Sequence, residues 1–265
     1  MSGLMHRPLY DQLVPYYELV EGRDWQREVR LIVSILKEHG SATVVDLGCG
    51  PGYHARMLAR HGFNVTGVDI SRPNILFARN RTQREYVHPH FVVGSYYKYR
   101  PRQSVDATLC LNWSIPTRDS ELRRFLRNTR AMVRVGGLLI LDFERISDIV
   151  WKDVGKPIVN SWNFKKLLIV RVSLGEISSN VLHSRDVYIL YSNRKTSRAP
   201  GEAARYRPVG GATPAKTYVD ASYVRFFSLS ELRHFAAESG FKLISCHVLP
   251  RNGYKRNYAV LARTT

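Results

Sequence analysis

Short apolar runs alternate with stretches of helical periodicity through the first half of the chain. The runs are rich in β-branched and aliphatic residues and predict strands at 43–47, 64–68, 91–93, 107–111 and 138–141. The stretches between them repeat apolar residues every three or four positions and predict helices around 31–36, at 53–60, from 71 onward and at 119–132. This alternation is typical of a mostly parallel sheet with helices on both faces, so we expect an α/β doubly wound fold.

The pattern changes at about residue 150. Extended, alternating segments predict antiparallel strands at 167–170, 187–190 and 223–226. Between 191 and 216 the chain is rich in Arg, Lys, Pro, Gly and Ala and poor in large aliphatic residues, which predicts a mobile basic loop. The segment from 150 to 227 is therefore expected to be β-rich and distinct from what precedes it.

Helix and strand patterns return after residue 228, with a final helix and strands at 242–248 and 258–261. We therefore expect one domain built from 1–149 and 228–265, into which the β-rich segment 150–227 is inserted.

Local signals predict where several elements begin and end. A Ser-Arg-Pro run at 71–73 predicts a helix N-cap with proline in the first turn. A pair of glycines at 136–137 predicts a break before the strand at 138–141. Ser230 is expected to cap the last helix, which Gly240 would end.

Composition narrows the class of protein. The 265 residues are 44% hydrophobic, which is enough for a substantial core in one large domain. No apolar run approaches the ~18 residues that span a bilayer, and charged residues interrupt the first 13 positions, so we expect neither a membrane anchor nor a signal peptide. The three cysteines are widely spaced, so we expect no disulfide framework, no metal site and a cytoplasmic location.

The net charge is +18 and the pI about 10.1. A basic surface raises the local concentration of anionic partners, including RNA, phosphorylated metabolites and acidic membranes. The charge is spread along the chain rather than gathered in one arm, so it selects no partner by itself.

The most informative motif is the run D-L-G-C-G-P-G at 46–52, between a predicted strand and a predicted helix. Glycines here permit a tight turn and close approach of a ligand to the backbone, where a Cβ atom would collide. Asp69 ends the next strand, 21 positions after Gly48, where a carboxylate can accept hydrogen bonds from both hydroxyls of a ribose. We therefore expect a nucleoside ligand at this loop.

The glycine spacing distinguishes between ligand classes. A nicotinamide dinucleotide site expects G-x-G-x-x-G, but this chain has G-x-G-x-G, with Tyr53 where the third glycine would lie. A Walker-type phosphate loop needs G-K-[ST], which is absent. The loop therefore fits neither of these two ligand classes.

The loop, with an acid before it and Asp69 after it, resembles the cofactor motif of class I S-adenosylmethionine-dependent methyltransferases, and the likeness runs from Leu9 to Asp142. The run Y-Y-E-L-V at 16–20, followed by R-D-W at 23–25, resembles the N-terminal signature of small-molecule N-methyltransferases of the sugar N,N-dimethyltransferase and glycine N-methyltransferase type. The resemblance implies a seven-stranded Rossmann-like sheet. Those enzymes also carry a β-rich insertion after the fifth strand, so 150–227 would be a substrate lid or an interface between copies.

By this resemblance the cofactor is S-adenosyl-L-methionine. Gly48, Gly50 and Gly52 would line its methionine and ribose portions, Asp46 would support the loop, and Asp69 would hold the ribose.

The resemblance also assigns residues beyond the loop. Ile70 would pack on the adenine, close to Ser95 and Tyr96, although the family often has an aspartate where this chain has Ser95. Tyr17 and Arg23 would close over the cofactor, the guanidinium being suited to its carboxylate. The residues expected beneath the sulfonium follow the fourth strand and are Leu111 and Asn112.

Methyl transfer from a sulfonium is an in-line displacement, for which the protein holds the nucleophile ~3–3.5 Å from the methyl carbon and excludes water. Asp142 ends an apolar strand and is expected to orient or deprotonate the acceptor together with Asn112, with Glu144 as a further candidate. His183 and Tyr188 of the insertion are further candidates for the acceptor pocket. The sugar-modifying relatives place a histidine after the fourth strand, where this chain reads W-S-I-P-T at 113–117, so an aminosugar acceptor does not follow.

Three functions stay open. The first is methyl transfer to an N or O nucleophile of a small molecule. The second is methyl transfer to RNA or protein, with a polyanion grip formed by 251–256 and by basic loop residues, namely Arg194, Lys195, Arg198, Arg205 and Arg207. The third is a non-catalytic module that binds the cofactor or nucleic acid. A homo-oligomer formed through the β insertion is compatible with each.

Overall fold

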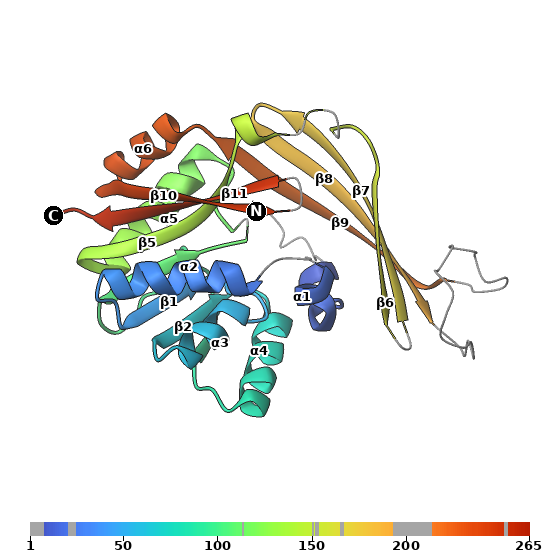
Figure 1. The fold of residues 1–265 in the computed structure, drawn as a ribbon, viewed down its shortest axis with the longest axis horizontal. Helices are drawn as coiled ribbons and strands as arrows, with labels where there is room; N and C mark the ends of the chain where they lie inside the picture. Colours follow the sequence, from blue (N-terminus) through green and yellow to red (C-terminus); the bar gives the residue numbers. More distant parts are fainter. Residues whose placement is uncertain are drawn as a thin grey trace.

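The chain folds around a mostly parallel sheet of seven strands in the order β3-β2-β1-β4-β5-β11-β10 (Figure 1). The computed structural model describes residues 8–20, 25–112, 114–149, 151, 154–164, 167–192, 214–251 and 254–265. The seven strands are β1 (Thr43–Leu47), β2 (Asn64–Asp69), β3 (His90–Val93), β4 (Val105–Cys110), β5 (Val133–Arg145), β10 (Phe241–Arg251) and β11 (Tyr254–Arg263). Strand β11 runs antiparallel to both of its neighbours, and the α/β doubly wound prediction is confirmed.

Helices cover both faces of this sheet because successive side chains of a strand point in opposite directions. Val44 faces one apolar cluster with α2, α3 and α4, whereas its neighbour Val45 faces a second cluster with α5 and α6. The helices are α2 (Trp25–Glu38), α3 (Tyr53–Arg60), α4 (Arg72–Glu85), α5 (Asp119–Met132) and α6 (Leu229–Glu238). The two clusters hold the carboxyl ends of β1, β2, β4 and β5 in fixed positions along one edge.

A second group of strands extends the sheet beyond β5, and Figure 1 shows it projecting to one side. These strands pair antiparallel in the order β9-β8-β7-β6, and β9 joins the main sheet through Glu144 of β5 paired with Phe226. They are β6 (Ile158–Phe164), β7 (Leu167–Ser178), β8 (Val181–Ser192) and β9 (Pro214–Phe227). The three predicted strands lie within β7, β8 and β9, whereas the role of the segment as a lid or interface stays a prediction.

The N-terminal segment packs against this extension. It contains η1 (Pro8–Tyr10), η2 (Val14–Tyr16) and α1 (Tyr17–Val20). Leu9, Leu13 and Tyr17 share one buried cluster with Tyr188 and Leu190 of β8. The segment is therefore held between α4 of the main domain and the inner face of the added strands.

Three predictions of element boundaries were wrong. β5 runs without a break through Gly136, whose φ of 75° accompanies a shift of register on β4 between Val105 and Ala107. The cap of α6 is Ser228, whose Oγ accepts from the N–H of Glu231 at 3.1 Å, because the helix begins at Leu229, one residue before Ser230. The loop predicted at 191–216 was too long at both ends, because β8 extends to Ser192 and β9 starts at Pro214. The rest of this loop lies outside the described residues.

Within the described part of the chain, no helix has both the length and the apolar character needed to cross a bilayer. The three cysteines are free thiols, with Cys49 and Cys110 buried and Cys246 half-buried. Among the same residues, no group of three or more His, Cys, Asp or Glu side chains is placed to hold a metal ion.

Asp106 at the start of β4 ties the opposite, amino-terminal edge of the sheet together. Its Oδ2 accepts from the N–H groups of Ala42 and Thr43 at 2.9 Å, and its Oδ1 accepts from Nε of Arg134 at 2.7 Å. Burial would raise the pKa of Asp106, but these hydrogen bonds hold it well below its usual range. The ionised carboxylate is thus favoured by the folded state.

We expect Asp106→Asn to lower the free energy of unfolding by about 1–3 kcal/mol at pH 7, since charge-assisted hydrogen bonds are lost. A carboxyl with a lowered folded-state pKa stabilises above its unfolded pKa of about 4 and loses that contribution as the pH falls further. Urea unfolding of both proteins between pH 7 and pH 3 should show the difference shrinking below about pH 4. A difference that is constant with pH would contradict this account.

Candidate cofactor and acceptor site

The glycine loop joins β1 to α3 at the carboxyl edge of the sheet. Gly48, Gly50 and Gly52 all have positive φ, at 73°, 53° and 78°. A Cβ atom on Gly48 would lie 2.6 Å from Oγ of Ser114, and one on Gly52 would lie 2.7 Å from the ring of Phe91. A Cβ on Gly50 would meet no atom within 4 Å. Gly48 and Gly52 are therefore required by packing, whereas Gly50 lies beside open space that a ligand can fill.

Asp69 lies next to this loop because β1 and β2 are parallel neighbours. Its Oδ2 accepts from the N–H of Gly50 at 2.8 Å, and its Oδ1 accepts from the N–H of Ser71 at 2.7 Å and from Asn74 at 3.5 Å. Burial raises the pKa of Asp69, and the hydrogen bonds from Ser71 and Gly50 limit that rise. The residue as a whole is half-buried beside the loop.

Asp46 is buried where β1 leads into the loop, with 2% of its surface exposed. Its Oδ2 is buried and has no hydrogen-bond partner among the described residues. Burial raises the pKa of Asp46 to about 6, and nearby His54 acts in the opposite direction. His54 in turn lies 3.6 Å from Glu28 of α2, so the loop rests on a buried polar cluster. A buried carboxylate oxygen of this kind is suited to a cationic group.

The other residues predicted to contact the cofactor are placed as follows. The ring of Tyr17 is buried beside Trp25, with centroids 6.3 Å apart, and Arg23 lies outside the described residues. Ile70 directly follows Asp69 and is 55% exposed.

Ser95 and Tyr96 follow β3. The Oγ of Ser95 accepts from the N–H of Tyr97 at 3.3 Å. The ring of Tyr96 packs against Phe125 of α5, with centroids 5.3 Å apart, so its described contacts lie on the α5 face of the sheet. Within the insertion, Tyr188 is buried in the cluster with the N-terminal segment, and exposed His183 contacts the ring of Tyr223.

Asn112 and Asp142 come together at the carboxyl ends of β4 and β5. Asn112 has a φ of 63°, which is uncommon for a residue other than glycine, and Leu111 before it is buried. Oδ2 of Asp142 accepts from the N–H of Asn112 at 2.9 Å and forms an ion pair with Arg256. The carboxylate therefore holds the strained turn that follows β4.

Arg256 is the residue that sequence reasoning misplaced. It was expected at the surface in a polyanion grip, but it is 5% exposed and lies on β11 against Asp142. Its Nη1 donates to Oδ1 of Asn112 at 3.4 Å, and its Nη2 lies 3.8 Å from Oε1 of Glu144. The expectation was wrong because β11 pairs with β5, with Tyr258 opposite Asp142. This register places Arg256, two residues before Tyr258, in the protein interior.

Comparisons with known proteins agree with this geometry. Residues 44–137 match the family model described as a methyltransferase domain. Glycine N-methyltransferase from Homo sapiens is 29% identical over 143 residues, covering 48% of this chain and 48% of that protein. The chain thus matches about half the length of the curated relatives, and the segment matched by the family model contains the glycine loop and Asp69.

Solved structures extend the likeness to the whole fold. A sugar N-methyltransferase from Streptoalloteichus sp. superposes with a TM-score of 0.72 at 19% identity, covering 94% of this chain and 93% of that one. An amino pentose methyltransferase from Micromonospora echinaspora, solved with S-adenosylmethionine bound, gives 0.70 at 19% identity over 98% and 100%. The predicted resemblance to class I methyltransferases of the small-molecule N-methylating kind is confirmed.

Proposed function

We propose that this chain is an S-adenosyl-L-methionine-dependent methyltransferase that acts on an N or O nucleophile of a small molecule. The observation that carries the proposal is the loop itself. Gly50 borders open space, the carboxylate of Asp69 lies beside it and accepts its N–H, and Asp46 has a buried carboxylate oxygen without a described partner. A positively charged amino acid attached to a nucleoside suits this combination.

The residues present fit the cofactor. Asp46 would neutralise its ammonium group, Gly48, Gly50 and Gly52 would let its chain approach the backbone, and Asp69 would accept from the ribose hydroxyls. The remaining residues that we propose for binding are those that the family resemblance assigns, namely Tyr17, Arg23, Ile70, Ser95, Tyr96 and Leu111. When bound, the cofactor supplies the electrophilic methyl group.

The protein's own contribution is to orient the acceptor and exclude water. We propose that Asn112 lines the part of the site that receives the methyl acceptor, and that Asp142 positions Asn112. Asp142 accepts from the N–H of Asn112 and is itself held by an ion pair with Arg256. Support for a small acceptor comes from the added strands, whose inner face packs on the N-terminal segment and can restrict access to the site.

The function is tested with purified protein and methyl-labelled S-adenosylmethionine. We expect label in small molecules when the protein is incubated with a fractionated cell extract, and glycine and an aminosugar are the first pure acceptors to try. Label in the RNA or protein fraction would favour the polymer substrate instead. Cofactor binding without label in any fraction would favour a non-catalytic module.

Asp46 makes cofactor binding depend on pH. Because its pKa is about 6, the carboxylate is mostly ionised at pH 8 and mostly protonated at pH 5. If the ionised form pairs with the cofactor's ammonium, affinity should be about tenfold weaker at pH 5 than at pH 8. In Asp46→Asn the affinity should be weaker at pH 8 and nearly independent of pH over this range. Calorimetric titrations at both pH values measure this, and equal pH dependence in the two proteins would contradict it.

A further inference from the structure

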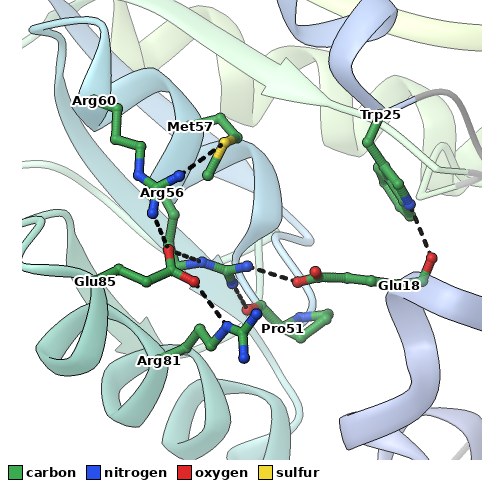
Figure 2. Close-up of polar contacts among 8 residues, drawn as sticks. All are labelled: Glu18, Trp25, Pro51, Arg56, Met57, Arg60, Arg81 and Glu85. Atoms are coloured by element: carbon green, nitrogen blue, oxygen red, sulfur yellow. Dashed lines mark hydrogen bonds and ion pairs between the residues drawn. The ribbon is translucent and has the colours of Figure 1, made fainter.

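A buried arginine ties the glycine loop to the N-terminal segment. Arg56 lies on α3, four residues after Gly52, and is 1% exposed. Its Nη1 donates to the carbonyl of Pro51 at 2.8 Å, its Nη2 to Oε1 of Glu18 at 2.7 Å, and its Nε to Oε2 of Glu85 at 3.1 Å. Figure 2 shows the guanidinium between the loop, α1 and the end of α4. One planar group thus joins three elements that are distant in sequence.

The two carboxylates that hold Arg56 differ in their other contacts. Glu85 also forms ion pairs with Arg60 at 3.0 Å and Arg81 at 2.7 Å, and its side chain is 16% exposed. The side chain of Glu18 is 24% exposed and has Arg56 as its ion-pair partner among the described residues. If Glu18 moves away, Arg56 keeps Glu85 and no buried charge is left unpaired. The Glu18 contact is therefore the one that can open at low cost.

The same segment is tethered at its other end. Oγ of Ser71 donates to the carbonyl of Tyr10 at 2.8 Å, while the N–H of Ser71 donates to Asp69. One tether is thus attached beside Asp69 and the other beside the loop, at Pro51. Residues 8–20 therefore run past the edge where Asp69 and Gly50 meet, and Tyr17, which lies between the two tethers in sequence, is buried.

We propose that Glu18 and Arg56 are positioning residues that latch segment 8–20 over the cofactor site and set the rate at which the cofactor leaves. The inference rests on the proposed function. A ligand bound beside Gly50 and Asp69 would be enclosed by this segment, so it would leave when the segment loosens. Opening of the contact between Glu18 and Arg56 releases the segment at the end next to the loop.

Glu18→Ala tests the latch, with Arg60→Ala as the matched control. Arg60 also belongs to the cluster in Figure 2, but it contacts Glu85 and Met57 rather than Glu18. Two quantities are measured in both variants: hydrogen–deuterium exchange of peptides within 8–20, and the dissociation rate of S-adenosylhomocysteine after dilution. We expect Glu18→Ala to raise the dissociation rate by about tenfold, as for loss of one charge-assisted hydrogen bond. Exchange should become faster within 8–20 and stay unchanged in β4 and β5.

Arg60→Ala should leave both quantities as in the unaltered protein. Glu18→Gln retains an oxygen that can accept from Arg56 but lacks the charge, and its dissociation rate should fall between those of the unaltered protein and Glu18→Ala. Equal exchange and equal dissociation in Glu18→Ala and Arg60→Ala would overturn the latch while leaving the proposed function intact. Failure of the unaltered protein to bind S-adenosylhomocysteine or S-adenosylmethionine would overturn the function itself, and the latch with it.

Discussion

Replacing Asp142 with alanine is expected to lower the free energy of unfolding by about 3–5 kcal/mol, the range measured when one partner of a buried ion pair is removed. Asp142 is 1% exposed, and Arg256 opposite it is 5% exposed. Without the carboxylate, Arg256 keeps Glu144 at 3.8 Å, and the N–H of Asn112 loses its acceptor although its backbone stays at a φ of 63°. Urea unfolding monitored by circular dichroism measures the effect.

Two further variants separate the ion pair from its surroundings. Arg256→Met combined with Asp142→Ala removes both charges, so the double variant should lose less stability than the sum of the single ones. Glu144→Gln affects the more exposed and more distant partner and should change stability by less than about 1 kcal/mol. If the loss of unfolding free energy in the double variant equals the sum of the losses in the two single variants, Asp142 stabilises the fold through contacts other than Arg256.

The sequence alone predicted the part of the site that depends on local chemistry. The G-x-G-x-G turn is set by backbone sterics within five residues, and Asp69 was identified because it ends the next strand. Strand and helix periodicity likewise located β1, β2, α3 and α5, because amphipathic patterns are local. The local pattern does not predict that Gly50 borders open space while Gly48 and Gly52 are crowded. The crowding comes from residues that are distant in sequence, Ser114 beside Gly48 and Phe91 beside Gly52.

The contacts that sequence reasoning missed join residues that are far apart. Arg256 and Asp142 are separated by 114 positions, and Arg56 and Glu18 by 38. A buried arginine has no periodic signature of its own, so Arg256 was expected to be a surface charge in a chain with a net charge of +18, and Arg56 was not singled out. The position of Arg56 in the first turn after the loop was the one available signal. Strand β6 was missed as well, because asparagines at 160 and 163 weaken its strand pattern.

We expect Asp69→Ala to weaken S-adenosylmethionine binding at least tenfold, because a carboxylate that accepts from two ribose hydroxyls contributes charge-assisted hydrogen bonds worth about 1.5–3 kcal/mol each. The substitution also removes the acceptor for the N–H of Gly50, so the loop itself becomes less ordered. Isothermal titration calorimetry of the purified variant measures the affinity.

Asp106→Ala is the matched control for this experiment. Asp106 is also an aspartate on a strand of the same sheet that accepts backbone N–H groups, but it lies at the opposite edge, beside Ala42 and Thr43. The Asp106→Ala substitution should therefore lower the free energy of unfolding without altering the affinity of the folded protein for S-adenosylmethionine. If Asp69→Ala binds the cofactor as tightly as the unaltered protein does, the carboxylate does not hold the ribose, and the assignment of this edge as the cofactor site is wrong. Weakening confined to Asp69→Ala locates the ligand at the edge where β1 and β2 end.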